Sequence, residues 1–295
     1  MLKKLLGVFG LALVLAIIWV EGPATILNAA SHANLALLIA AEAFLVSLNL
    51  FKGLRLHELL KSIQRLRFRD SLRVFCFGQL VNQGIMTALG EVSKGLMLKR
   101  LHGLSFSRSM SIIVVERGFD LLFALALSAL VLAQVNKAWL PLAIGLAAAL
   151  AALIAAIAFL PQNLFRFFQR FKQPWHAYTN FRNGLRGLSP RFLAIAFAVS
   201  VAAWTLEGLG NQFILYSLGV NLPLLTVLGV TSLSLVVGFA SFIPGGIGAR
   251  EASLVLLYSA LGVPGPTALA QGLIYRISIA ANDYAIYLLA GWRKK

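Results

Sequence analysis

Charged residues lie within or beside strongly apolar segments of this chain, where an isolated charge is costly. They are Glu42, Glu91, Lys94, Glu116, Arg117, Asp120, Glu207, Arg250, Glu251, Arg276 and Asp283. At the centre of a membrane helix each costs about 2.5–3.5 kcal/mol, so such residues pair with one another or line a wet cavity. Cations in a cavity of this kind can bind an anionic group such as a phosphate, and carboxylates can balance charge or exchange protons.

A glycine-rich segment, Pro244-Gly245-Gly246-Ile247-Gly248, comes directly before a predicted helix that begins near Ala249. Glycine adopts positive φ values without strain, and the first turn of a helix offers free N–H groups and the positive end of its dipole. Arg250, near the start of that helix, adds a full positive charge. The segment therefore favours recognition of a phosphate group.

The region around Gly90 carries a similar pattern of glycine and charge. Gly90, Gly103 and Arg117 recur at nearly constant spacing as Gly248, Gly262 and Arg276. In membrane proteins, two glycine-broken and charged segments of this kind indicate a substrate site between two repeats. The predicted substrate-binding set is Glu91, Lys94, Arg117, Gly245, Gly246, Gly248, Arg250, Glu251 and Arg276.

Several of these charges also fit a purely structural role. Glu116, Arg117 and Asp120 fall on one helical face by their spacing, so an internal ion-pair cluster is the alternative to a binding site. Glu91 and Glu251 are placed to hold the neighbouring cations when no ligand is bound. Candidates for proton coupling or for counter-charges are Glu42, Glu207, Glu116, Asp120 and Asp283.

The elements that must position these residues are membrane helices. Of the 295 residues, 59% are hydrophobic and 12% charged, whereas a soluble domain carries about 25% charged residues. Apolar runs occur at about 5–20, 33–51, 119–135, 139–160, 192–218 and 267–292. The first run is short, so a signal peptide competes with the retained helix that we favour, because no small-residue cleavage motif follows it.

The net charge of +16 is concentrated in the predicted connections between these runs. One cluster comprises Lys52, Arg55, Lys61, Arg65, Arg67, Arg69 and Arg73, and another comprises Arg166, Arg170, Lys172, Arg182, Arg186 and Arg191. Such clusters are typical of cytoplasmic loops that contact anionic headgroups. Because no nucleic-acid motif accompanies them, nucleic acid is not an expected partner.

Cysteine and histidine usage argues against disulfide and metal chemistry. Cys76 is the single cysteine, and His32, His57, His102 and His176 are scattered without metal-ligand spacing. We therefore expect no metal and no cofactor.

The topology follows from placing both basic clusters and both termini in the cytoplasm. One unit then covers about 33–135, a second of opposite orientation covers about 192–292, and the run at 139–160 links them. Each unit is a helix, a hairpin broken near Gly84–Gly90 or Pro244–Gly248, and a helix. We predict one transmembrane domain over 1–295: an all-α polytopic protein of the bacterial inner membrane, an inverted-topology repeat with two broken re-entrant hairpins around a central cavity.

The same motifs resemble those of the flippase-like integral membrane family, which includes the transmembrane half of lysylphosphatidylglycerol synthase. The first motif is Gly90-Glu91-x-x-Lys94, then Gly103-Leu104-Ser105 and Glu116-Arg117-x-x-Asp120; the second is Pro244 to Glu251, then Gly262-Val263. Lys94 stands where many members have arginine, which keeps the charge but loses bidentate geometry. The resemblance implies movement of lipids or lipid-linked molecules between leaflets. It does not extend to the synthase's soluble aminoacyl-transferring domain, so we do not expect aminoacylation.

Three functions follow as alternatives. The first, which we favour, is a transporter and not an enzyme: a flippase for a membrane phospholipid or a polyprenyl-phosphate-linked lipid, in which Lys94, Arg117, Arg250 and Arg276 bind the phosphate. The second is a membrane-embedded transferase or hydrolase acting on lipid-linked substrates with Glu91, Glu251 or Asp283 as base. The third is a non-transporting partner of a lipid- or glycan-synthesis enzyme. A homo-oligomer is a further possible assembly.

Overall fold

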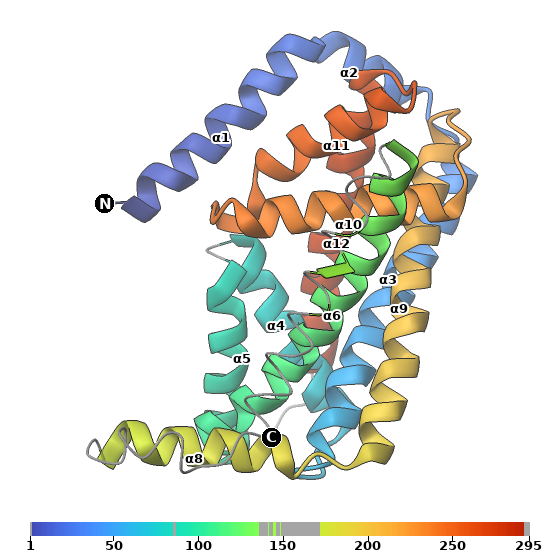
Figure 1. Ribbon diagram of the computed structural model, residues 1–295. Coiled ribbons are helices and arrows are strands. Elements are labelled where there is room, and N and C mark those ends of the chain that lie inside the picture. The colour runs from blue at the N-terminus through green and yellow to red at the C-terminus, as the bar shows by residue number, and fades with distance from the viewer. Residues whose placement is uncertain are drawn as a thin grey trace.

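The two most apolar stretches of the chain form two long helices that pack against each other, α3 (Leu35–Leu60) and α9 (Pro190–Ser217). The structure is a computed structural model that describes residues 2–84, 87–135 and 172–291, with the isolated positions 141, 144, 145 and 148. Within these ranges, α3 and α9 are the two helices that are each long and apolar enough to cross a membrane on their own. They run antiparallel, because Asn34 pairs with Ser217 at one end and Arg55 with Ser200 near the other (Figure 1).

A bent pair of helices at the start of the chain adds a third candidate span. Helix α1 (Leu2–Glu21) is followed by helix α2 (Pro23–Ser31), and the bend between α2 and the Leu11–Glu21 part of α1 is 79°. Gly22 has a φ of 83°, which glycine tolerates, and Pro23 begins the second helix, so the sequence itself sets the bend. The apolar run predicted at 5–20 is therefore helical, and α2 continues it in a new direction.

The first broken hairpin consists of α4 (Phe68–Gly84) and α5 (Thr87–His102), which pack side by side. Asn82 meets Gly90 near the turn, and Gly78 meets Lys94 further from it, so the two helices run antiparallel. Gly103, with a φ of 68°, then ends α5, and α6 (Phe106–Val135) follows. Helix α6 begins at Phe106, well before the apolar run predicted at 119–135. Hydropathy places the start too late because the charged residues Glu116 and Arg117 lie in the N-terminal half of the helix.

The second half repeats this order of elements. Helix α10 (Leu224–Ala240) is followed by the short 3₁₀ turn η3 (Pro244–Gly246), α11 (Ala249–Ala260) and α12 (Gly265–Gly291). The glycines of the predicted break, Gly245, Gly246 and Gly248, all have positive φ. Gly262 ends α11 with a φ of 83°, as Gly103 ends α5. The predicted break at Pro244–Gly248 is thus present as a turn between two helices.

The two predicted basic loops contain more helix than expected. Lys52 and Arg55 do not lie in a loop, because α3 continues to Leu60 and carries both into the bundle. In the second cluster, α8 (Lys172–Arg186) lies across the end of the bundle and packs against α6 (Figure 1). The predicted linking run at 139–160, apart from the isolated positions, falls outside the described residues, as do Arg166 and Arg170.

Apolar packing holds the helices together, and large apolar side chains also cover the outside. Leu56 and Leu59 of α3, Leu98 of α5 and Ile112 of α6 are fully buried in one cluster. Outward-facing residues include Trp19, Ile39, Leu256, Ile277 and Leu289, each more than half exposed. Soluble proteins rarely expose so many large apolar side chains, so this surface suits a lipid environment.

Candidate functional site

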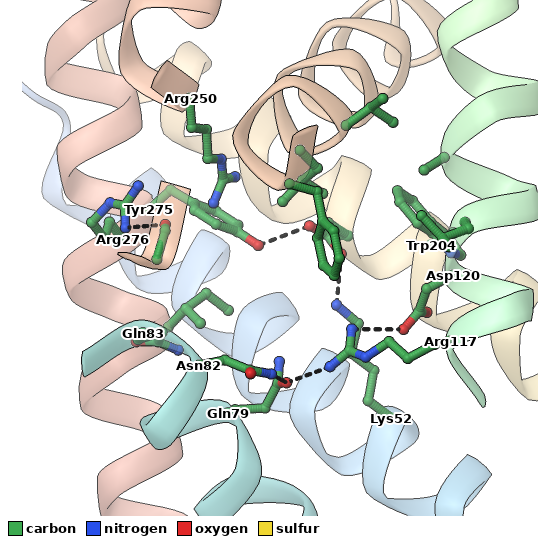
Figure 2. A pocket seen from close by; sticks show the side chains of 18 of the residues that line it. Lys52, Gln79, Asn82, Gln83, Arg117, Asp120, Trp204, Arg250, Tyr275 and Arg276 are labelled. Carbon is green, nitrogen blue, oxygen red and sulfur yellow. Dashed lines mark hydrogen bonds and ion pairs between the residues drawn. The ribbon is translucent and has the colours of Figure 1, made fainter. Parts of the chain in front are cut away.

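A cavity of about 190 Å³ opens between the two halves of the described chain. Its polar lining comes from α3, α4, α6, α9, α11 and α12: Asn49, Lys52, Gln79, Asn82, Gln83, Arg117, Asp120, Glu207, Arg250, Tyr275 and Arg276 (Figure 2). Gly245 of η3 and the ring of Trp204 complete it. Of the predicted binding residues, the structure brings Arg117, Gly245, Arg250 and Arg276 to this cavity, so both glycine-broken segments contribute to one site.

Six side chains form a closed ring of alternating charge at one side of the cavity. Around the ring, the contacts are Glu91–Lys94 (3.1 Å), Lys94–Glu116 (3.2 Å), Glu116–Arg55 (3.4 Å), Arg55–Asp120 (2.6 Å), Asp120–Arg117 (3.2 Å) and Arg117–Glu91. The ring joins α3, α5 and α6, and its three carboxylates balance its three cations. The internal ion-pair cluster considered for Glu116, Arg117 and Asp120 is therefore present, and it is larger than the sequence indicated.

Most of this charge ring lies beneath the cavity wall. Lys94 and Glu116 are fully buried, and the Lys94 ammonium lies 5.1 Å from the centroid of the Phe75 ring. Arg117 and Asp120 are the ring members that line the cavity. Lys94 and Glu91, both in the predicted substrate-binding set, are thus placed in the wall, where each is satisfied by partners of opposite charge.

In the second half, Arg276 and Glu251 hold the glycine turn in place. Glu251 Oε1 accepts from Arg276 Nε at 2.9 Å and Nη2 at 2.6 Å, while Glu251 Oε2 accepts from the Gly248 N–H at 2.7 Å. Arg276 Nη1 also donates to the Gly245 carbonyl at 3.1 Å. This arrangement caps α11 through its third residue and fixes the turn. Gly246 and Gly248 shape the turn without lining the cavity.

Arg250 differs from the other cations of the cavity. Its guanidinium lies 4.4 Å from the centroid of the Tyr275 ring, and its Nε has no hydrogen-bond partner. In the described part of the chain, no carboxylate lies within ion-pair distance of it, whereas Lys52 and Arg276 each have one and Arg117 has two. Tyr275 in turn donates its hydroxyl to Glu207 at 2.8 Å, and Glu207 pairs with Lys52 at 2.8 Å.

Glu42 of α3 and Glu207 of α9, two of the predicted candidates for proton coupling or counter-charge, lie in different surroundings. Glu207 is buried and lines the cavity. Glu42 is half-buried in a separate hollow lined mainly by apolar residues, among them Leu38, Ile214 and Ile274. Asp283, the remaining predicted acid, is fully buried and contacts the cavity-lining Gln83.

Sequence reasoning missed Lys52 and Arg55 as members of the site. Hydropathy predicts a basic loop for both, because the charge of Lys52 ends the apolar run at position 51. Asn49, Lys52 and Arg55 follow one another at intervals of three residues, which is the spacing of one helical face and was the available signal. Tyr275, Trp204 and Gln79 carried no such signal. Within the described ranges, no group of His, Cys, Asp and Glu residues is arranged to hold a metal ion.

Comparison with known proteins finds similar membrane proteins. The family model described as lysylphosphatidylglycerol synthase TM region matches residues 7–290. A UPF0104 membrane protein of Methanothermobacter thermautotrophicus is 27% identical over 289 residues, which cover 90% of this chain and 85% of the relative. A UPF0104 membrane protein of Methanocaldococcus jannaschii is 26% identical over 203 residues, which cover 67% of this chain and 86% of the relative. The protein is therefore an integral membrane protein.

Proposed function

We propose that this chain, which belongs to the lysylphosphatidylglycerol synthase transmembrane-region family, is a transporter that moves an anionic or phosphate-bearing lipid between the two leaflets of its membrane. The lipid is a phospholipid or a polyprenyl-phosphate-linked intermediate, whose headgroup enters the central cavity while its acyl chains stay in the bilayer. The protein itself performs no bond-making chemistry on that lipid.

The observation that carries this proposal is the free charge of Arg250. A cation that already has a carboxylate partner gains little from a phosphate, because the phosphate must compete with that partner. Arg250 lies in the cavity, is held by an aromatic ring and has no carboxylate within ion-pair distance in the described ranges. Arginine also matches the geometry of phosphate with two parallel hydrogen bonds.

The arrangement of the two halves supports a cavity that opens toward either leaflet. Arg117 of α6 pairs with Glu91 of the preceding helix, and Arg276 of α12 pairs with Glu251 of the preceding helix. The opening helices α3 and α9 run antiparallel. These features are what two inverted repeats would produce, and in transporters of that design the substrate site lies between the repeats near the middle of the membrane.

Helix lengths support the proposed re-entrant hairpins. Helix α4 has 17 residues, α5 has 16, α10 has 17 and α11 has 12. A helix needs about 20 residues to cross the hydrocarbon core, with a range of about 17–25, so α5 and α11 are too short to span it and α4 and α10 are at the lower limit. Two short helices joined by a turn can enter the membrane and return to the same side, and non-helical backbone at that depth is tolerated where it lines a cavity.

The test is mass spectrometry of the lipids that co-purify with the protein. We expect an anionic or phosphate-bearing lipid with the wild type and about a tenfold to hundredfold loss with Arg250→Ala, because a hydrogen bond to a charged group contributes about 1.5–3 kcal/mol. Arg100→Ala, which removes an exposed arginine of α5, is the matched control and should keep the lipid.

Three results would contradict the proposal. Equal lipid content in the Arg250→Ala protein and the wild type would show that this cation does not bind the headgroup. Conversion of an added lipid into a new product by the purified protein would instead favour the membrane-embedded enzyme. If Arg250→Ala spared function in cells while neutralisation of the basic residues at 61–69 destroyed it, the non-transporting partner would be favoured.

A further inference from the structure

Asp283 is a buried acid that has no lysine or arginine within ion-pair distance among the described residues. It lies on α12 with no exposed surface, its Oδ2 accepts from Gln83 Nε2 at 2.8 Å, and its Oδ1 has no hydrogen-bond partner. The other acids in and around the cavity each have a lysine or arginine within ion-pair distance. They are the buried Glu91, Glu116, Glu207 and Glu251 and the half-buried Asp120. In the part of the chain that the structure describes, Asp283 has none.

An ionised carboxylate in this position would be costly. Effective penalties for burying one unpaired ion amount to several kcal/mol, whereas a protonated carboxylic acid is a neutral polar group that is far cheaper to bury. The contacts of Asp283 fit the neutral form, because Oδ2 receives one amide hydrogen bond, Oδ1 has no hydrogen-bond partner, and the Cys76 thiol beside the carboxyl group is only a weak donor. In this conformation of the protein, Asp283 therefore holds a proton.

The groups that face Asp283 come from three other helices. Cys76 and Gln83 approach from α4, Lys52 from α3 and Lys94 from α5. Both lysines are engaged elsewhere, Lys52 with Glu207 and Lys94 with Glu91 and Glu116. The charged residues of α9 and α11 near the cavity face other partners: Glu207 faces Tyr275 and Lys52, Glu251 faces Arg276, and Arg250 lies on Tyr275.

Asp283 contacts Gln83, and Gln83 lies where the end of α4 meets the glycine turn at Gly245. The Gln83 side chain lines the cavity, and its backbone carbonyl lies so close to the glycine turn that a Cβ on Gly245 would be 2.8 Å away. A change in the charge of Asp283 would act first on this contact. Ionised Asp283 would also compete with Glu207 for Lys52, which lines the same cavity.

We propose that Asp283 is a proton-binding site that couples lipid movement to the proton gradient across the membrane. The inference rests on the proposed function. In the coupling step the O–H bond of the carboxylic acid breaks, the proton passes to water in the cavity, and the carboxylate that remains draws Lys52 away from Glu207. Reprotonation from the other side of the membrane restores the contacts seen here. The sequence predicts five candidates for proton coupling or counter-charge, and the geometry favours Asp283 among them. The five are Glu42, Glu207, Glu116, Asp120 and Asp283.

The experiment uses the full chain in vesicles of phosphatidylcholine and phosphatidylglycerol that contain a fluorescent phosphatidylglycerol. The rate at which the probe changes leaflet is followed by dithionite quenching, with and without a pH gradient. We expect the gradient to accelerate movement by the wild type. Asp283→Asn should keep the gradient-independent rate and lose the acceleration, and Asp283→Glu should regain it. Glu42→Gln, a matched control outside the cavity, should respond as the wild type does.

A second readout does not depend on transport. Infrared spectra of the purified protein at neutral pH should contain the carbonyl band of a protonated carboxylic acid, and Asp283→Asn should lose that band. A wild type without such a band overturns the inference even if Asp283→Asn fails to fold. The inference is also overturned if the pH gradient does not change the rate of probe movement by the wild type, or if it still accelerates movement by Asp283→Asn. Either result leaves the proposed transport intact. A wild type that moves none of the probe counts against the proposed function itself.

Discussion

The guanidinium of Arg250 lies over the ring of Tyr275, 4.4 Å from the ring centroid. This contact holds a cation in place without neutralising it, because the face of an aromatic ring attracts a positive charge but carries no net charge of its own. A carboxylate in the same position would fix the arginine equally well and would then compete with a lipid phosphate. Tyr275 therefore positions Arg250 and leaves its charge available.

Replacing Tyr275 separates the role of its ring from that of its hydroxyl. Tyr275→Phe keeps the ring under Arg250 and loses the hydrogen bond to Glu207, whereas Tyr275→Leu loses both. Since a cation–π contact is worth about 0.5–2 kcal/mol, we expect Tyr275→Leu to weaken phosphatidylglycerol binding about twofold to thirtyfold and Tyr275→Phe to weaken it less. Equilibrium titration of the purified protein with a labelled lipid measures this, and an equal loss in both variants would assign the effect to the hydroxyl.

The charge ring predicts that two substitutions are better tolerated than one. Lys94→Met leaves the ring with one uncompensated negative charge, and loss of one partner from a buried pair costs about 3–5 kcal/mol. Lys94→Met combined with Glu116→Gln restores the balance of charge, so we expect it to be more stable than Lys94→Met alone. Unfolding in detergent, followed by circular dichroism, gives the free energies. The exposed Lys99→Met is the control, and a double variant less stable than the single one would refute the balance argument.

Close approach of α4 and α5 predicts a specific requirement for glycine at position 90. A Cβ on Gly90 would overlap the Gly78 carbonyl and the side chain of Asn82, whereas a Cβ on Gly84 would meet nothing within 4 Å. We expect Gly90→Ala to lower the free energy of unfolding by about 1–3 kcal/mol, the usual effect of overpacking, and Gly84→Ala to leave it nearly unchanged. The same detergent unfolding assay decides between them; similar values for both variants would mean that the hairpin adjusts to the extra methyl group.

The breaks of the fold could be predicted from sequence because they depend on single residues. Gly103, Gly262 and the glycines at 245–248 adopt positive φ, and few other residues could replace them there. The extents of α3 and α6 could not be predicted in this way. Hydropathy treats each charge as a reason to end a helix, but Arg55 continues α3 because Glu116 and Asp120 of α6 neutralise it.

The sequence also could not show which cations are free to bind a phosphate and which are neutralised by carboxylates. Lys94 and Arg250 follow corresponding glycine breaks, so the sequence predicts the same phosphate-binding role for both. Lys94 meets two glutamates from its own helix and from α6, whereas Arg250 meets an aromatic ring from α12. That difference depends on which side chains reach the two positions from distant parts of the chain, and spacing along the sequence carries no record of it.

The balance of the charge ring has an electrical consequence. A voltage of 100 mV across a membrane does about 2.3 kcal/mol of work on each elementary charge that crosses it. Glu91, Glu116 and Asp120 cancel Lys94, Arg55 and Arg117, so the field does almost no net work on these six side chains if they shift together. In the second half the voltage acts on Arg250, and a singly charged phosphate bound there would cancel that force as well.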